Sequence, residues 1–149
     1  HGCTQVTGTD GTVIAGPVFT LSTSGALPAQ VNTAGCFLLL VPAGGSYTVR
    51  ASYPGYLQAQ KSNVFASGSQ VLIGTSKLFG GDVNSDNSVN ILDIVGIIGN
   101  LGAAVPVGSI AGCPIDNPFD INDNGSVEIG DLSIATGNFG KIGPTNWAP

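Results

Sequence analysis

Two stretches of twelve residues place oxygen-bearing side chains at the same offsets. They run from Asp82 to Asp93 and from Asp120 to Asp131. In both, positions 1, 3, 5, 9 and 12 carry Asp, Asn or Glu, and position 7 is a serine that can offer its backbone carbonyl. Calcium is a hard cation that takes about six to eight oxygen ligands, so its binding loop must fold several such groups onto one point. The spacing is that of an EF-hand-type calcium loop.

The acidic residues of the chain are concentrated in and around these two loops. Of the nine Asp and Glu residues, only Asp10 lies outside residues 82–131. Carboxylates gathered in this way repel one another unless a cation lies among them. Asp, Asn and Gly stretches also form ordinary turns, which is the alternative interpretation of each loop. Two loops in the same register favour two calcium ions over two turns.

The composition excludes several classes of function. Charged residues make up 9% of the chain, the net charge is −5, and only four residues are basic, which argues against nucleic-acid binding. No apolar run approaches the roughly 20 residues of a membrane span. Glycine is abundant and methionine is absent, which suits an extracellular β-rich protein. The sequence opens at His1, so we expect that a secretion signal has been removed or lies upstream.

The three cysteines, Cys3, Cys36 and Cys113, leave one unpaired after any single bridge. In an oxidising compartment we expect a disulfide between Cys3 and Cys36, with Cys113 free or joined to another chain. The alternative is three reduced cysteines packed as small hydrophobic side chains.

Residues 1–79 have the pattern of a small β-sandwich. Short runs of β-forming residues are separated by Gly, Pro, Asn and Ser turns about every 8–12 residues. We expect strands at the following places: 12–14, 18–21, 36–41, 46–52 and 71–73. Alternation sends Leu39 and Val41 to one face and Leu38 and Leu40 to the other. The second pair indicates either a further buried surface or two tolerated surface leucines.

One segment of this half carries a family pattern. Residues 35–49 read G-C-F-L-L-L-V-P-A-G-G-S-Y-T-V, and Pro54-Gly55-Tyr56 follows. This resembles the carboxypeptidase-regulatory-like, transthyretin-like Ig-type family over about 75 residues. The match departs at an extra glycine before Tyr47 and at Cys36, which stands at a usually polar position.

Each acidic loop leads into a short apolar stretch that predicts a helix. Position 12 opens each stretch, so Asp93 and Asp131 should lie at a helix N-terminus, where an acid is favoured. Gly-Asn-x-Gly sequences at 99–102 and 137–140 are matching stops. The two units superpose at a shift of 38 residues, as from Asp93 to Asp131, and so form an internal repeat. The first helix is apolar nearly all round, so we expect both its faces to be covered.

A duplicated loop of this kind, followed by one helix and lacking the entering helix of an EF-hand, resembles a dockerin over residues 80–147. The tail from Asn138 to Trp147 is similar to dockerin C-termini. The resemblance implies two calcium ions and a cohesin-like partner. The ligands it implies for the first ion are Asp82, Asn84, Asp86, the Ser88 carbonyl, Asn90 and Asp93. Those for the second ion are Asp120, Asn122, Asn124, the Ser126 carbonyl, Glu128 and Asp131.

Three features depart from the family. Loop position 6, normally glycine, is Gly125 in the second loop but Asn87 in the first. Asparagine tolerates a left-handed backbone better than other non-glycine residues, so binding should survive. The linker at 103–119 is longer than usual. Asp123 fits no ligand position, and we expect it to face water.

The predicted fold class is therefore a two-domain chain. An all-β Ig-like sandwich over residues 1–79 precedes a small α, dockerin-like domain over residues 80–149 with two calcium loop–helix repeats. We expect no enzyme, because His1 has no Ser or Cys partner, a Cys/His zinc site is not formed, and paired carboxylates occur only in the loops.

Two non-enzymatic functions stay open. In one, the chain is a secreted subunit that binds identical subunits in an extracellular filament or surface structure. In the other, it docks a larger secreted protein or enzyme onto a cohesin-like receptor. The outward leucines, the apolar first helix and Cys113 favour the filament.

Overall fold

The computed structural model describes residues 39–68, 71–74, 76–105 and 117–147 throughout. Before residue 39 it describes six short strands: β1 (Gly2–Cys3), β2 (Val6–Thr7), β3 (Val13–Ile14), β4 (Val18–Leu21), β5 (Ala29–Gln30) and β6 (Cys36–Phe37). Five strands and two helices follow: β7 (Ser46–Ser52), β8 (Gly55–Tyr56), β9 (Ala59–Phe65), β10 (Gly80–Asp82), α1 (Ile91–Gly99), α2 (Ile129–Gly137) and β11 (Thr145–Asn146).

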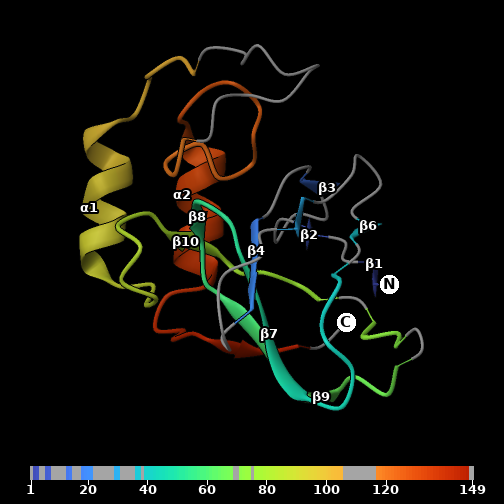
Figure 1. The fold of residues 1–149 in the computed structure, drawn as a ribbon. Coiled ribbons are helices and arrows are strands. Elements are labelled where there is room, and N and C mark those ends of the chain that lie inside the picture. Colours follow the sequence, from blue (N-terminus) through green and yellow to red (C-terminus); the bar gives the residue numbers. More distant parts are fainter. Residues whose placement is uncertain are drawn as a thin grey trace.

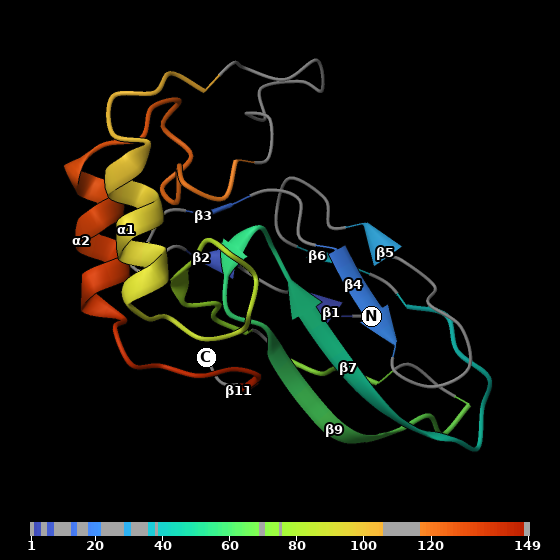
Figure 2. The same cartoon turned by 90° about the vertical axis from the view of Figure 1, so that its left-hand side faces the viewer.

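A five-stranded sheet forms the framework of the described fold, in the order β11-β9-β7-β4-β5 (Figures 1 and 2). The antiparallel pair β7 and β9 is its longest part, with Val49 opposite Lys61 and Ala51 opposite Ala59. Between these strands lie residues 53–58, which we call the corner. The chain returns at its C-terminal end to add β11 parallel to β9.

The two helices lie side by side at one end of this sheet (Figures 1 and 2). Strand β10 runs against both helices and pairs with β8 of the corner, with Gly80 opposite Tyr56. A side chain at Gly80 would not fit, because a Cβ atom there would lie 2.5 Å from Ile121 and 3.0 Å from Ile134. The same Cβ atom would lie 3.2 Å from the Tyr56 ring, so residues 80–147 are packed closely against the corner at this point.

The prediction of a sandwich followed by a separate α domain is wrong. Strands predominate among the described residues, and the only helices there are two of nine residues each. Helices this short cannot bury much apolar surface between themselves, so they share a core with the sheet. Val49 and Ala51 of β7 belong to the same hydrophobic cluster as Ile97 of α1 and Ala135 of α2. The prediction failed because it treated each half as if it closed its own core. The boundary near residue 80 itself stays a prediction.

The expected strands are recovered in part. The strands predicted at 18–21 and 46–52 are confirmed, whereas 71–73 is not a strand. Strand β9 was missed, because its sequence A-Q-K-S-N-V-F lacks both alternation and a run of β-branched residues. Leu40 is exposed, and Leu39 and Val41 pack on the core, as the alternation predicted.

One backbone observation bears on the predicted disulfide between Cys3 and Cys36. Strands β1 and β6 are antiparallel, and their register places Cys3 opposite Cys36. Directly opposed residues have Cα atoms about 4.5–5.5 Å apart, a separation that a disulfide can bridge. The disulfide stays a prediction, and Cys113 lies outside the described residues.

Candidate metal-binding loops and docking face

Position 1 of each loop shapes the turn. In the first loop, Asp82 accepts hydrogen bonds from the backbone N–H groups of Asp86 (3.0 Å) and Asn87 (2.9 Å). In the second, Asp120 accepts from Asn124 (3.1 Å) and Gly125 (2.9 Å). Both carboxylates are buried. The loops therefore share one fold, as the shift of 38 residues predicted.

Positions 3 and 5 continue the same pattern in the first loop. Asn84 Oδ1 accepts from the Asp86 N–H at 2.9 Å, and Asp86 Oδ1 accepts from the Ser88 N–H at 2.9 Å. The amides of Asn84 and Asn90 donate to Asp86 Oδ2 at 3.0 and 3.3 Å. Positions 3, 5 and 9 therefore lie within reach of one another.

The second loop repeats the backbone bonds, and its side-chain bond runs from position 5 to position 9. Asn122 Oδ1 accepts from the Asn124 N–H at 3.1 Å, and Asn124 Oδ1 accepts from the Ser126 N–H at 3.0 Å. The Asn124 amide donates to Glu128 Oε1 at 2.6 Å. The structure thus brings the predicted positions 3, 5 and 9 together in both loops.

Position 12 joins each loop to its helix. Asp93 and Asp131 are fully buried at the third residue of α1 and α2. Asp93 accepts from the backbone of Asn90 at 2.8 Å and of Val83 at 2.9 Å, while Asp131 accepts from the backbone of Glu128 at 2.8 Å. The prediction that these acids lie at helix N-termini is confirmed, and each one ties the loop entrance to its exit.

The electrostatic environment disfavours negative charge at position 1. The pKa of Asp82 is raised to about 6, mainly by burial and in part by the nearby charges of Asp93 and Asp86, against the lowering effect of the Asn87 N–H bond. Burial also raises the pKa of Asp120, against the bonds from Gly125 and Asn124. A cation placed among these oxygens would offset both the burial and the repulsion.

The donor set consists of oxygen atoms. Within the described parts of the chain, no group of three or more His, Cys, Asp or Glu side chains lies close enough to hold a metal by those residues alone. A bound ion would therefore need Asn oxygens and backbone carbonyls as well, which is the mixture that calcium accepts. The residues fit calcium in chemistry, and its binding stays a prediction.

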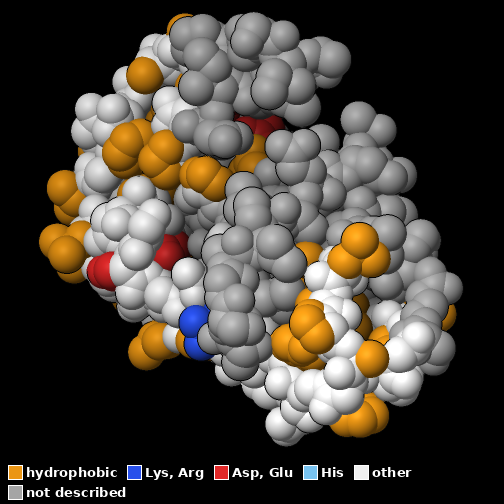
Figure 3. Space-filling view, in the orientation of Figure 1, with side chains coloured by type: hydrophobic (Ala, Val, Ile, Leu, Met, Phe, Trp, Pro, Cys, Tyr) orange, Lys and Arg blue, Asp and Glu red, His pale blue; other side chains and the backbone are white. Residues whose placement is uncertain are grey.

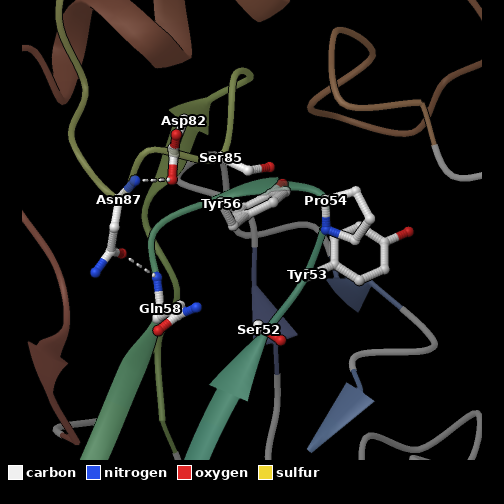
Figure 4. A pocket seen from close by; sticks show the side chains of 8 residues that line it. All are labelled: Ser52, Tyr53, Pro54, Tyr56, Gln58, Asp82, Ser85 and Asn87. Carbon is white, nitrogen blue, oxygen red and sulfur yellow. Dashed lines mark hydrogen bonds between the residues drawn. The ribbon is translucent and has the colours of Figure 1, made fainter.

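Two residues outside the predicted ligand set, Asn87 and Asp123, make hydrogen bonds to the corner that the sequence did not predict. Asn87, at position 6, has φ 63°, which confirms that asparagine can take the place of glycine there. Its Oδ1 accepts from the backbone N–H of Gln58 at 3.0 Å (Figure 4). Asp123 was expected to face water; it is half-buried, and its Oδ2 also accepts from the Tyr53 hydroxyl at 3.1 Å. Their hydrogen-bond partners in the corner, Gln58 and Tyr53, were not predicted, because the Pro54-Gly55-Tyr56 turn was the only pattern recognised in that segment.

A shallow cavity of about 360 Å³ lies between the corner and the first loop (Figure 4). Its lining comes from both segments and from the end of β7: Ser52, Tyr53, Pro54, Tyr56, Gln58, Asp82, Ser85 and Asn87. It is open to solvent, and its two tyrosines are engaged elsewhere. The cavity therefore lies where the corner meets the first loop.

The outer face of α1 carries exposed apolar side chains. Leu92 is 63% exposed and Val95 58%; Ile98 continues the row at helical spacing, and Leu101 extends it just beyond the end of the helix. Figure 3 shows hydrophobic side chains gathered along the side of the molecule where α1 lies. The expectation that both faces of α1 are covered is wrong within the described structure. A row of exposed apolar side chains this large is uncommon on the surface of a monomeric protein.

The second helix does not repeat this row. The positions equivalent to Leu92, Val95 and Ile98 are Gly130, Ser133 and Thr136. Only the ends of the α2 unit expose large apolar residues, namely Ile129 and Phe139. The internal repeat therefore preserves the loops and differs on the surface, so that of the two described helices only α1 has an exposed apolar face. No helix in the described residues is both long and apolar enough to cross a bilayer.

No protein-family model matches this chain. Two curated proteins of Acetivibrio thermocellus are similar to it, cellulosomal-scaffolding proteins B and A, each 31% identical over 105 residues, or 67% of this chain. The matched regions cover 13% and 5% of those proteins, so the chain corresponds to a small part of either.

Two solved structures share the fold. Both are interface mutants of a type II cohesin–X-dockerin complex from Acetivibrio cellulolyticus. The C-terminal interface mutant matches with a TM-score of 0.71 at 22% identity, covering 95% of this chain and 94% of the matched one. The N-terminal interface mutant matches with a TM-score of 0.69 at 20% identity, covering 95% and 96%. The likeness extends over nearly the whole chain, which agrees with the shared core and contradicts a detached α domain. This chain therefore has the fold of a chain found in a type II cohesin–X-dockerin complex.

Proposed function

We propose that this chain acts in an extracellular protein–protein assembly, as one member of a cohesin–dockerin-type pair. The exposed apolar row on α1 carries the proposal, because it is a ready-made contact surface on a rigid helix. The similarity to scaffolding proteins and to chains from cohesin–X-dockerin complexes supports it. These comparisons favour docking over the filament subunit. The absence of a catalytic constellation in the sequence further supports a non-enzymatic role.

Calcium in the two loops would hold this surface in place. Asp93 ends the first loop and lies in the first turn of α1, so an ion bound there would fix the helix that carries the apolar row. The ligands would be the twelve residues predicted from the sequence, six in each loop. Metal binding in such a loop contributes directly to folding free energy. Calcium would thus act as a structural ion.

The partner we propose is a cohesin-like domain, because the duplicated loop–helix units resemble those of dockerins. A dockerin is the second candidate. The predominance of strands among the described residues favours it, since a strand-rich member of the pair would present its sheet instead. The two candidates place the contact on different surfaces of this chain.

Binding measurements separate the candidates. The purified chain would be tested by calorimetry against a type II cohesin and, separately, against a type II dockerin, with calcium and with a chelator. We expect calcium-dependent binding to the cohesin. Binding to the dockerin alone would establish the second candidate, and binding to neither would refute the docking function.

A matched pair of variants then locates the surface. Val95→Asp places a charge in the apolar row, and Ser133→Asp places the same charge at the equivalent exposed position of α2. We expect Val95→Asp to weaken binding by at least about 100-fold, as for a central contact residue, and Ser133→Asp to change it little. Equal effects would show that α1 is not the preferred face.

A further inference from the structure

The two loops are both fastened to the corner by residues that are not predicted ligands. Asn87 of the first loop receives the Gln58 N–H at 3.0 Å, and Asp123 of the second receives the Tyr53 hydroxyl at 3.1 Å. The Tyr56 hydroxyl adds a buried bond to the carbonyl of Ile121. Asn87 and Asp123, which lie in the bends of the two loops, therefore also bind the corner that joins β7 and β9.

Asn87 makes hydrogen bonds to three separate parts of the chain. Its N–H donates to Asp82 Oδ2 at 2.9 Å, and its carbonyl accepts from the Gly143 N–H at 2.8 Å. Its side chain reaches the corner at Gln58. One residue thus touches a predicted calcium ligand, the corner and the C-terminal segment that leads to β11. A glycine at this position would keep the two backbone bonds and lose the third.

The backbone of Asn87 sets where its side chain points. It lies in the left-handed region at φ 63°, a conformation imposed by the loop bending around position 1. An ion that orders Asp82 would order this turn, and with it the direction of the Asn87 amide. A loop that becomes less ordered without calcium would lose the hydrogen bond from the Gln58 N–H to Asn87 Oδ1.

We propose that Asn87 is a positioning residue that couples calcium occupancy of the first loop to order in the corner. This inference rests on the proposed calcium binding. It extends the role of the ion from the loop–helix half to the edge of the β7–β9 pair. Asn87 replaces the usual glycine because the side chain performs this coupling.

The test compares the intact chain with three variants. Asn87→Gly removes the side-chain acceptor in the residue type that such loops normally use, and Asn87→Asp retains an acceptor at the same place. Ser85→Gly is the control. Ser85 also has positive φ (61°) in the same loop, and its change leaves the Asn87–Gln58 bond untouched. Amide hydrogen exchange of Gln58 is then measured with calcium and with chelator. The Leu57 amide, which donates to Phe79 at 2.8 Å, is an internal reference in the same corner.

In the intact chain we expect calcium to slow exchange at Gln58 by about tenfold or more, the equivalent of one hydrogen bond gained. Asn87→Gly should bind calcium and lose most of this protection, whereas Asn87→Asp and Ser85→Gly should retain it. Calorimetric calcium titration accompanies each sample. Equal protection in Asn87→Gly and the intact chain would overturn the coupling while leaving the calcium loops standing. Failure of the intact chain to bind calcium would overturn both.

Discussion

Replacing Tyr56 by Phe tests whether the two halves of the chain share one cooperative core. Tyr56 is 3% exposed, and its hydroxyl donates to the backbone carbonyl of Ile121 across the seam between corner and second loop. The substitution keeps the ring and its edge-on contact with Tyr53 at 5.6 Å. It removes the donor and leaves a buried carbonyl without that partner. An unpaired buried polar group costs about 1–3 kcal/mol.

The control is Tyr47→Phe. The Tyr47 hydroxyl donates to Pro42 at 2.8 Å in an exposed hydrogen bond within one turn. Water can replace that donor, so the loss should be at most about 0.5 kcal/mol. For a chain of this size, about 1 kcal/mol corresponds to about 2–4 °C in Tm. We therefore expect Tyr56→Phe to lower Tm by about 4–8 °C for a loss of about 2 kcal/mol, and Tyr47→Phe by far less.

Two spectroscopic probes follow unfolding in urea at fixed calcium, one local and one global. The single tryptophan, Trp147, lies in the C-terminal segment, and its indole N–H donates to Gly74 at 3.3 Å. Far-ultraviolet circular dichroism reports on sheet and helix together. With one core, both signals should change at the same urea concentration, and Tyr56→Phe should shift both equally. Separate transitions in the intact chain, or a Tyr56→Phe effect no larger than that of Tyr47→Phe, would refute the shared core.

Three further predictions concern the calcium loops, the Cys3–Cys36 disulfide and the packing around Gly80. Asp82→Ala combined with Asp120→Ala should abolish the stabilisation by calcium, seen as melting curves that no longer differ between calcium and chelator; unchanged curves in the intact chain would count against the calcium site. Peptide mass spectrometry without reductant should recover a disulfide between Cys3 and Cys36, and free thiols at both would disprove it. Gly80→Val should cost about 1–3 kcal/mol through overpacking, measured by urea unfolding, and a neutral result would contradict the close contact there.

The loops and helices could be predicted because their signals are local. A carboxylate at position 1 accepts N–H groups four and five residues later, and a carboxylate at position 12 caps the helix that it opens, as Asp82 and Asp93 show. Such bonds depend on spacing in the sequence and not on the rest of the fold. The 38-residue shift then repeated the pattern and fixed both helices to within a residue or two.

The corner could not be predicted, because its bonds join distant parts of the chain. Gln58 meets Asn87 across 29 residues, and Tyr53 meets Asp123 across 70. Strands β10 and β11 are two or three residues long and gain their order from β8 and β9. No periodic pattern can appear in segments so short. The error of two separate domains came from this source, since the contacts that join the halves leave no local trace.

The two repeats differ from each other at particular positions, and these differences carry structural information that their common pattern does not. Duplication preserved the residues that bend the loops and changed those that face outward, so Leu92 and Val95 correspond to Gly130 and Ser133. Two equivalent helix faces would let a partner bind in two orientations, whereas one apolar face permits one. The non-ligand positions diverged as well, with Asn87 holding the corner from one loop and Asp123 from the other. Differences between the repeats, rather than their common pattern, therefore determine how the loops attach to the corner and which of the two described helices exposes an apolar face.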